Sequence, residues 1–276
     1  MPDGPIFPEP EYLRRQSALL SQLDINSILL IPTNKMKVRS HDVHFPFRAS
    51  SDILYLTGWE EPKALFVGHH DGTKWKTTLF VQDNNELAER WEGRRVGLSG
   101  AQERWPVDYA RDWETRLDVL EGWMQTKSTI YIQQGHDKDL DTMVNTLVTT
   151  KSREKTVTGK GPSAIVDPSS LLSELRIRKS ESEISIMREA AIIASKAHIH
   201  AMRNTQGDSN ESEIQSLIES EFMKNQSVPS YGSIVAGGDN ATILHYHANR
   251  DSVNDGSLIL IAVSYTHLTL PTSPKV

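Results

Sequence analysis

The alternation of helix-type and strand-type segments over the first half of the chain constrains its fold more than any other feature. The helix-type segments are Glu11–Leu23, Leu117–Met124 and Leu140–Val148, and the strand-type runs are Ile28–Ile31, Ile53–Thr57, Ala64–Val67, Thr77–Val81 and Thr129–Ile132. Each run is short, apolar and bounded by turn residues such as Pro32 or Asp71-Gly72. The pattern predicts an α/β domain with a mixed sheet over residues 1–155.

A change in composition follows this domain. Residues 156–168 are rich in Thr, Gly, Ser, Lys and Pro, which is typical of a connection between domains. We therefore predict a linker over residues 156–173 and a second domain over residues 174–261.

The second domain opens on the clearest helix signal in the chain. Ser180 and Glu183 have the spacing of a capping box, in which each residue bonds a backbone N–H of the other. A helix over about 180–204 then carries an apolar stripe, made of Ile184, Met187, Ala191, Ala194, His198 and Ala201. A second helix over about 210–225 and apolar runs at Thr242–Tyr246 and Leu258–Ile261, both predicted as strands, indicate an α+β domain.

Composition excludes several functional classes. The net charge of −6 and the pI of about 5.9 offer no electrostatic footprint for nucleic acid. The chain has no cysteine, so it is no disulfide-stapled scaffold. No apolar run approaches the roughly 20 residues of a membrane helix, and residues 1–10 do not resemble a signal peptide. We expect a cytoplasmic protein.

Four blocks carry a more specific signal. They are residues 47–62 (FRASSDILYLTGWEEP), 89–97 (ERWEGRRVG), 174–191 (ELRIRKSESEISIMREAA) and 231–261, which runs from YGSIVAGGDNATILHYHAN to DGSLILI. In this order the blocks resemble the Xaa-Pro aminopeptidases (the aminopeptidase P family). The resemblance implies an N-terminal domain of the creatinase/aminopeptidase P type, followed by an incomplete α+β pita-bread domain.

The resemblance also implies an activity. Members of this metallopeptidase family use two Mn²⁺ ions to activate a water that releases the N-terminal residue preceding a proline. Peptides with proline at the second position are the implied partners, and the intact protein is expected to be a homo-oligomer. A proline dipeptidase relative is the nearest alternative. A non-catalytic peptide-binding or oligomerisation module is the alternative from another class.

Three residues are carried over from the family as site residues. His245 matches a histidine beside the metals that helps to handle substrate and proton, whereas a lone histidine on an apolar strand is more often part of the core. Trp91 and Tyr231 match substrate-binding positions. Their alternatives are a rim tryptophan packed on arginine stems and a tyrosine packed by its ring. His247 could pair with His245 in a metal site, but two ligands without carboxylates make a weak one.

The metal ligands themselves are not found. The resemblance puts the first aspartate ligand at position 262, which is Ala262, and the others beyond it. Residues 263–276 contain neither Asp nor Glu and depart from the family pattern. We therefore expect an aberrant tail over 262–276, no metal bound by this chain, and no catalytic activity of the 276 residues as they stand.

Overall fold

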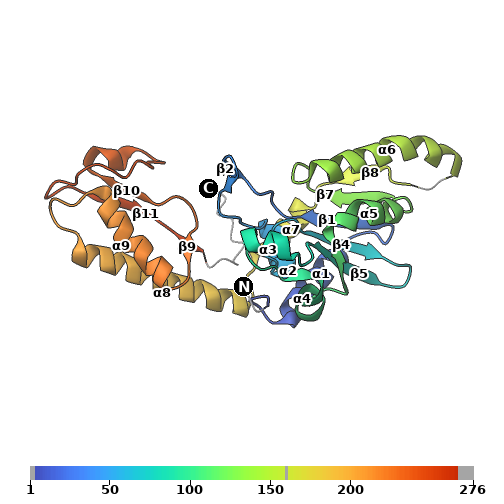
Figure 1. Ribbon diagram of the computed structural model, residues 1–276, viewed down its shortest axis with the longest axis horizontal. Coiled ribbons are helices and arrows are strands. Elements are labelled where there is room, and N and C mark those ends of the chain that lie inside the picture. Colours follow the sequence, from blue (N-terminus) through green and yellow to red (C-terminus); the bar gives the residue numbers. More distant parts are fainter. Residues whose placement is uncertain (1–3, 159–160, 267–276) are drawn as a thin grey trace. The chain divides into compact units, whose positions relative to one another are not determined.

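The computed structural model describes residues 4–158 and 161–266, and its chain divides into two units, one reaching Arg178 and the other beginning at Lys179 (Figure 1). The first unit is built on a six-stranded sheet with the order β6-β5-β4-β1-β7-β8. Its strands are β1 Ser27–Pro32, β4 Leu65–His70, β5 Trp75–Val81, β6 Tyr109–Asp112, β7 Thr129–Ile132 and β8 Ala164–Val166. The β1·β4 and β4·β5 pairs are antiparallel and the other three are parallel, which confirms the predicted mixed sheet.

Helices cover both faces of this sheet (Figure 1). One face packs against α1 Glu9–Leu20, α2 Ser51–Thr57, α4 Gly97–Arg104 and α7 Ser169–Ile177, and the other against α5 Arg116–Met124 and α6 Lys138–Thr158. Strand β1 lies between the two layers and is buried along its whole length. Leu29 and Ile31 join one core cluster and Ile28 and Leu30 the other, because successive side chains of a strand point to opposite faces.

The predicted strand at Ile53–Thr57 is wrong, because these residues form helix α2. The Ser50 hydroxyl accepts a hydrogen bond from the Ile53 N–H at the start of the helix, and Gly58 ends it with a φ of 70°. All five residues from Ile53 to Thr57 are buried. A fully buried short run has no polar side to show its periodicity, so the sequence pattern could not separate helix from strand.

The predicted linker over residues 156–173 also differs from the structure. Within that range, β8 pairs in parallel with β7, and α7 contributes Leu172, which is 1% exposed, to the core of the first unit. The α6 helix extends to Thr158. The Gly, Ser and Pro residues of this range therefore belong to short turns between secondary-structure elements and not to a linker between domains. The first unit continues to Arg178.

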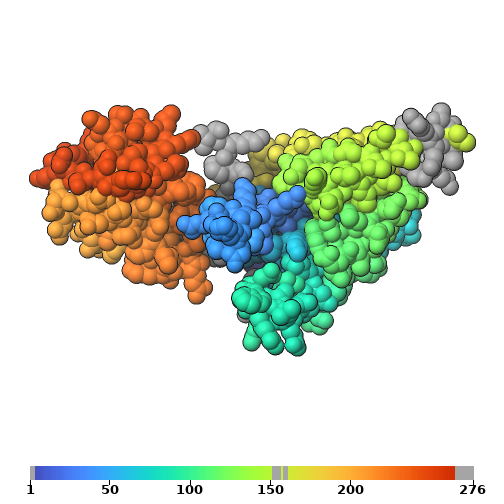
Figure 2. Space-filling model, turned by 45° about the horizontal axis from the view of Figure 1, so that its top comes forward, coloured from blue at the N-terminus to red at the C-terminus, as the bar shows by residue number. Residues whose placement is uncertain are grey.

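A small hairpin projects from the first unit between β1 and α2. Strands β2 Val38–Ser40 and β3 Val43–His44 pair with each other, and every residue of both is exposed. Figure 2 shows this segment in blue at the surface. The remaining elements of the unit are α3 Glu86–Glu92 and the 3-10 turn η1 Trp113–Thr115.

The second unit packs two helices against small sheets. Its elements are α8 Glu181–Asn204, α9 Glu211–Lys224, β9 Val228–Pro229, β10 Ile234–Gly237, the 3-10 turn η2 Gly238–Thr242, β11 Ile259–Ala262 and β12 Tyr265–Thr266. The capping box at the start of α8 is confirmed, since the Ser180 N–H donates to Glu183 and the Glu183 N–H donates to the Ser180 hydroxyl. Strand β10 pairs antiparallel with β11, and β9 with β12.

Three details of this unit differ from prediction. The buried side of α8 is formed by Glu183, Ala197 and Ala201, while Met187 of the predicted stripe is 40% exposed. Residues 242–246 do not form a strand, and β11 pairs with β10 instead. Ala262 continues the β11 register and β12 pairs with β9, so the first residues of the predicted tail are part of sheets; residues 267–276 lie outside the described range.

Candidate functional site

The segment from Gly237 to Asp251 is held in place by one carboxylate, that of Glu211 at the start of α9. Glu211 is fully buried and accepts hydrogen bonds from the Gly237 N–H at 2.8 Å and the Asn240 amide at 3.0 Å. It also accepts from the Tyr246 hydroxyl at 2.7 Å and the Asp251 N–H at 3.0 Å. Both ends and the middle of the segment are therefore tied to one side chain.

A second buried polar residue, Asn249, supports the same segment from its other side. Its side-chain oxygen accepts from the Val235 N–H at 3.1 Å, and its amide donates to the Ser233 carbonyl at 2.7 Å and to Gln215 at 2.9 Å. Asn249 has a φ of 45°, a conformation that Asn adopts more readily than most residues. The segment that it helps to hold carries the predicted catalytic histidine.

His245 lies at the surface of this segment, in a turn rather than on the predicted strand. Its neighbour Tyr246 points into the unit, while His245 and His247 are exposed with their ring centroids 6.5 Å apart. The predicted substrate-binding Tyr231 is 42% exposed. Its neighbour Gly232 lies beside His247, since a Cβ on Gly232 would meet the His247 ring at 3.5 Å. The structure thus brings the Tyr231 segment and the His245 segment together.

Trp91 belongs to the first unit. It lies on α3, a short helix that begins at the Asn85 cap and has no buried residue, and its side chain is 86% exposed. Near it, Arg95 forms an ion pair with Glu92, three residues earlier in the sequence, at 2.9 Å. An indole that remains so exposed contributes little to the core of its own unit.

The electrostatics of Glu211 and Tyr246 follow from their contact. Burial by itself would raise the pKa of Glu211, but the hydrogen bonds from Gly237, Asn240 and Tyr246 favour the charged form, and the net result is a lowered pKa. Burial, together with the hydrogen bond to the Glu211 carboxylate, raises the pKa of Tyr246 to about 12. At neutral pH the pair is therefore a carboxylate and a neutral phenol.

The donor set of the described residues does not fit a two-metal centre. Ala262, at the end of β11 opposite Ile234, offers no side-chain ligand atom. Within residues 4–158 and 161–266, no group of three or more His, Cys, Asp or Glu side chains is placed to hold a metal ion. His245 and His247 offer two imidazoles and no carboxylate bridge.

Two protein families match this chain in consecutive stretches. The family described as "Aminopeptidase P, N-terminal domain" matches residues 12–131, and "Metallopeptidase family M24" matches residues 185–268. The first match lies within the six-stranded unit, and the second covers α8, α9 and the segment with His245.

Individual relatives agree with these matches. The Xaa-Pro aminopeptidase of Haemophilus influenzae is 36% identical over 92% of this chain and 57% of its own length. The proline aminopeptidase P II of Yersinia pestis has a TM-score of 0.87 at 31% identity, covering 95% of this chain and 61% of that one. A zinc-substituted Escherichia coli aminopeptidase P in complex with product has a TM-score of 0.87 at 32% identity, covering 94% and 59%.

The order of the two domains and these likenesses match metallopeptidase family M24 and its pita-bread fold, of which the second domain is present in part. Within that class, the chain belongs to the Xaa-Pro aminopeptidase family. It spans 57–61% of the length of the relatives above. None of the helices in its described residues is long and apolar enough to cross a membrane.

Proposed function

We propose that this chain carries the substrate-facing portion of an aminopeptidase that removes the residue preceding a proline. The observation that supports this most is the likeness to aminopeptidase P over 94–95% of the chain, since it includes both the first domain and the His245 segment. His245 would contact the substrate, with Tyr231 beside it. Trp91 would bind peptide through an indole that its own unit leaves exposed.

Divalent metal, with Mn²⁺ as the proposed ion, would supply the water nucleophile in the whole protein. The residues described in this chain would instead bind and orient the peptide, because they offer side chains with hydrogen-bonding and apolar groups but no metal-bridging carboxylates. Homo-oligomeric assembly and a cytoplasmic location belong to the same proposal. The absence of cysteine is consistent with that location.

The second candidate is peptide binding without cleavage by the 276-residue chain. Ala262 favours binding without cleavage, because the resemblance puts a metal-binding aspartate at this position and alanine has no side-chain donor atom. A fluorogenic Xaa-Pro peptide separates the two candidates when it is incubated with the purified chain and Mn²⁺. We expect no turnover above a metal-only blank, and turnover that a chelator abolishes would contradict this expectation.

Binding is tested with a proline-containing peptide whose scissile bond has been reduced, followed by amide NMR. We expect His245→Ala to weaken binding about tenfold, equivalent to about 1.4 kcal/mol. His198→Ala, a histidine on α8 in the same unit, is the matched control and should leave the affinity unchanged. Equal peptide affinities for the wild type, His245→Ala and His198→Ala would show that His245 is not part of the peptide site.

A further inference from the structure

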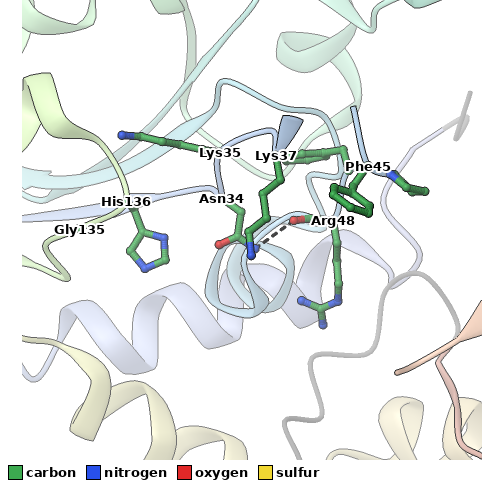
Figure 3. Close-up of a pocket in the computed structure, with 9 residues that line it drawn as sticks. Asn34, Lys35, Lys37, Phe45, Arg48, Gly135 and His136 are labelled. Atoms are coloured by element: carbon green, nitrogen blue, oxygen red, sulfur yellow. Dashed lines mark hydrogen bonds between the residues drawn. The ribbon is translucent and has the colours of Figure 1, made fainter. Parts of the chain in front are cut away.

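A pocket in the first unit has a lining that the proposed function does not use. It has a volume of about 450 Å³ and lies where three loops meet, after β1, after β3 and after β7 (Figure 3). Its lining residues are Asn34, Lys35, Lys37, Phe45, Pro46, Phe47, Arg48, Gly135 and His136. Figure 3 shows Lys35 and His136 on one side of the pocket and Phe45 on the other.

The charge of this lining is all of one sign. Lys35, Lys37 and Arg48 are cationic, His136 can become so, and none of the lining residues is Asp or Glu. Within the described part of the chain, none of the three cations forms an ion pair. This concentration stands out in a chain whose net charge is −6. Unneutralised charge around a concave surface focuses a positive potential there.

Two carboxylates close to the pocket residues in sequence, Asp52 and Asp137, form ion pairs with other arginines. Asp52 pairs with Arg176 at 2.9 Å. Asp137 pairs with Arg116 at 3.3 Å and accepts hydrogen bonds from the N–H groups that follow it at the start of α6. Because these two acids already have partners, neither of them neutralises Lys35, Lys37 or Arg48.

The pocket is also shaped before any ligand arrives. The Asn34 amide donates to the Arg48 carbonyl at 3.0 Å and so joins two of the three loops. Arg48 donates to the Ala49 carbonyl at 3.1 Å and to the Ser51 hydroxyl at 3.2 Å. Burial and the nearby Arg176 charge lower the pKa of Arg48, which agrees with a positive surrounding.

The aromatic part of the lining limits the kind of anion. Phe47 is partly buried against the core cluster that includes α1 and α2, whereas Phe45 is 50% exposed and faces the pocket. A fully hydrated inorganic ion would gain nothing from these rings, whereas an anion attached to an apolar group would bury part of them.

We propose that this pocket binds a small anion, a carboxylate or a phosphate, attached to an apolar group. Lys35 and Lys37 supply point charges, Arg48 supplies a charge fixed by its two hydrogen bonds, and Phe45 provides the apolar wall. The site lies in the first unit and is independent of the peptide site proposed around His245.

Amide NMR on the full chain tests the proposal with two probes. Phenyl phosphate presents a phosphate on an apolar ring, and phenylacetate presents a carboxylate on the same ring without the free amine that an aminopeptidase substrate needs. We expect saturable shifts at the amides of residues 34–37, 45, 47–48 and 135–136, with a dissociation constant of about 1 mM or lower for at least one probe. The tighter of the two probes identifies the anion class.

A matched pair of double variants separates the pocket from general electrostatics. Lys35→Gln with Lys37→Gln should weaken binding about tenfold. Lys63→Gln with Lys74→Gln removes the same charge at exposed positions outside the pocket and should change affinity less than about twofold. Equal losses in both variants, shifts spread over the basic surface, or no shift with either probe at about 10 mM would overturn the proposal.

Discussion

Glu211 matters more to the second unit than any residue that the sequence motifs single out. It is a fully buried acid with four hydrogen-bond donors from one segment, and those donors include both ends of that segment. Removing the charge would leave its donors without a matched acceptor, and an unmatched buried polar group is costly. The position of His245 therefore depends on a carboxylate that is buried inside the unit.

Substituting Glu211 by Gln should destabilise the second unit by about 2 kcal/mol, because the new amide group donates where an acceptor is needed. The pKa of Glu211 is lowered from 4.5, so its contribution to stability is complete above that value and is lost as pH falls through the lowered pKa. Urea midpoints from the amide signals of Gly237 and Asp251, at about pH 6 and about pH 3.5, measure this. The wild type should lose more stability between the two pH values than Glu211→Gln does.

Among the elements, the two long helices of the second unit, α8 and α9, both begin with a capping box. Ser180 caps α8 and Asn210 caps α9, and in each case a Glu three residues later bonds back to the N–H of the cap. Such reciprocal bonds satisfy backbone donors that the first helical turn leaves free. The start of both helices is therefore set by local chemistry rather than by the sheets that they cover.

Ser180→Ala should cost about 1 kcal/mol, which is typical for the loss of a helix cap. Ser185→Ala, at an exposed position inside α8, is the control and should have almost no effect. Urea unfolding followed by amide signals in α8 measures both. A cost below about 0.3 kcal/mol for Ser180→Ala would show that packing alone positions the start of α8.

At the scale of the whole molecule, the boundary between the units lies after α7. Strand β8 completes the edge of the sheet and α7 places Leu172 in the core, so residues 161–178 belong energetically to the first unit. All six tryptophans also lie before Arg178. Tryptophan fluorescence therefore reports the first unit alone.

Residues 1–178 produced without the second unit should fold and keep the fluorescence midpoint in urea that they have in the full chain. Residues 1–155 should be less stable by at least about 3 kcal/mol, since deleting one buried leucine already costs about 2–5 kcal/mol. The two fragments differ in residues 156–178, which contain the predicted linker over residues 156–173. Equal urea midpoints for the two fragments would support the predicted linker and contradict the boundary at Arg178.

Local patterns were sufficient for several elements of the chain. The strands at Ile28–Ile31 and Thr129–Ile132 and the capped helices α8 and α9 lie within a few residues of their predicted bounds. Of the predicted site residues, the structure places Tyr231 and His245 in neighbouring segments, which the sequence did not predict. No sequence signal pointed to Glu211 or Asn249 as anchors, because their partners lie 14–40 residues away along the chain.

Composition and periodicity along the chain were enough to predict the order of the domains and the mixed sheet, and the resemblance of four motifs indicated the family. Tertiary structure alone decided that Ile53–Thr57 is a helix, that residues 161–178 complete the first unit, and that His245 lies on an exposed turn. In each case the deciding contacts join residues far apart in sequence. Burial from both sides, or a single buried carboxylate, then outweighs the weak local preference of the chain.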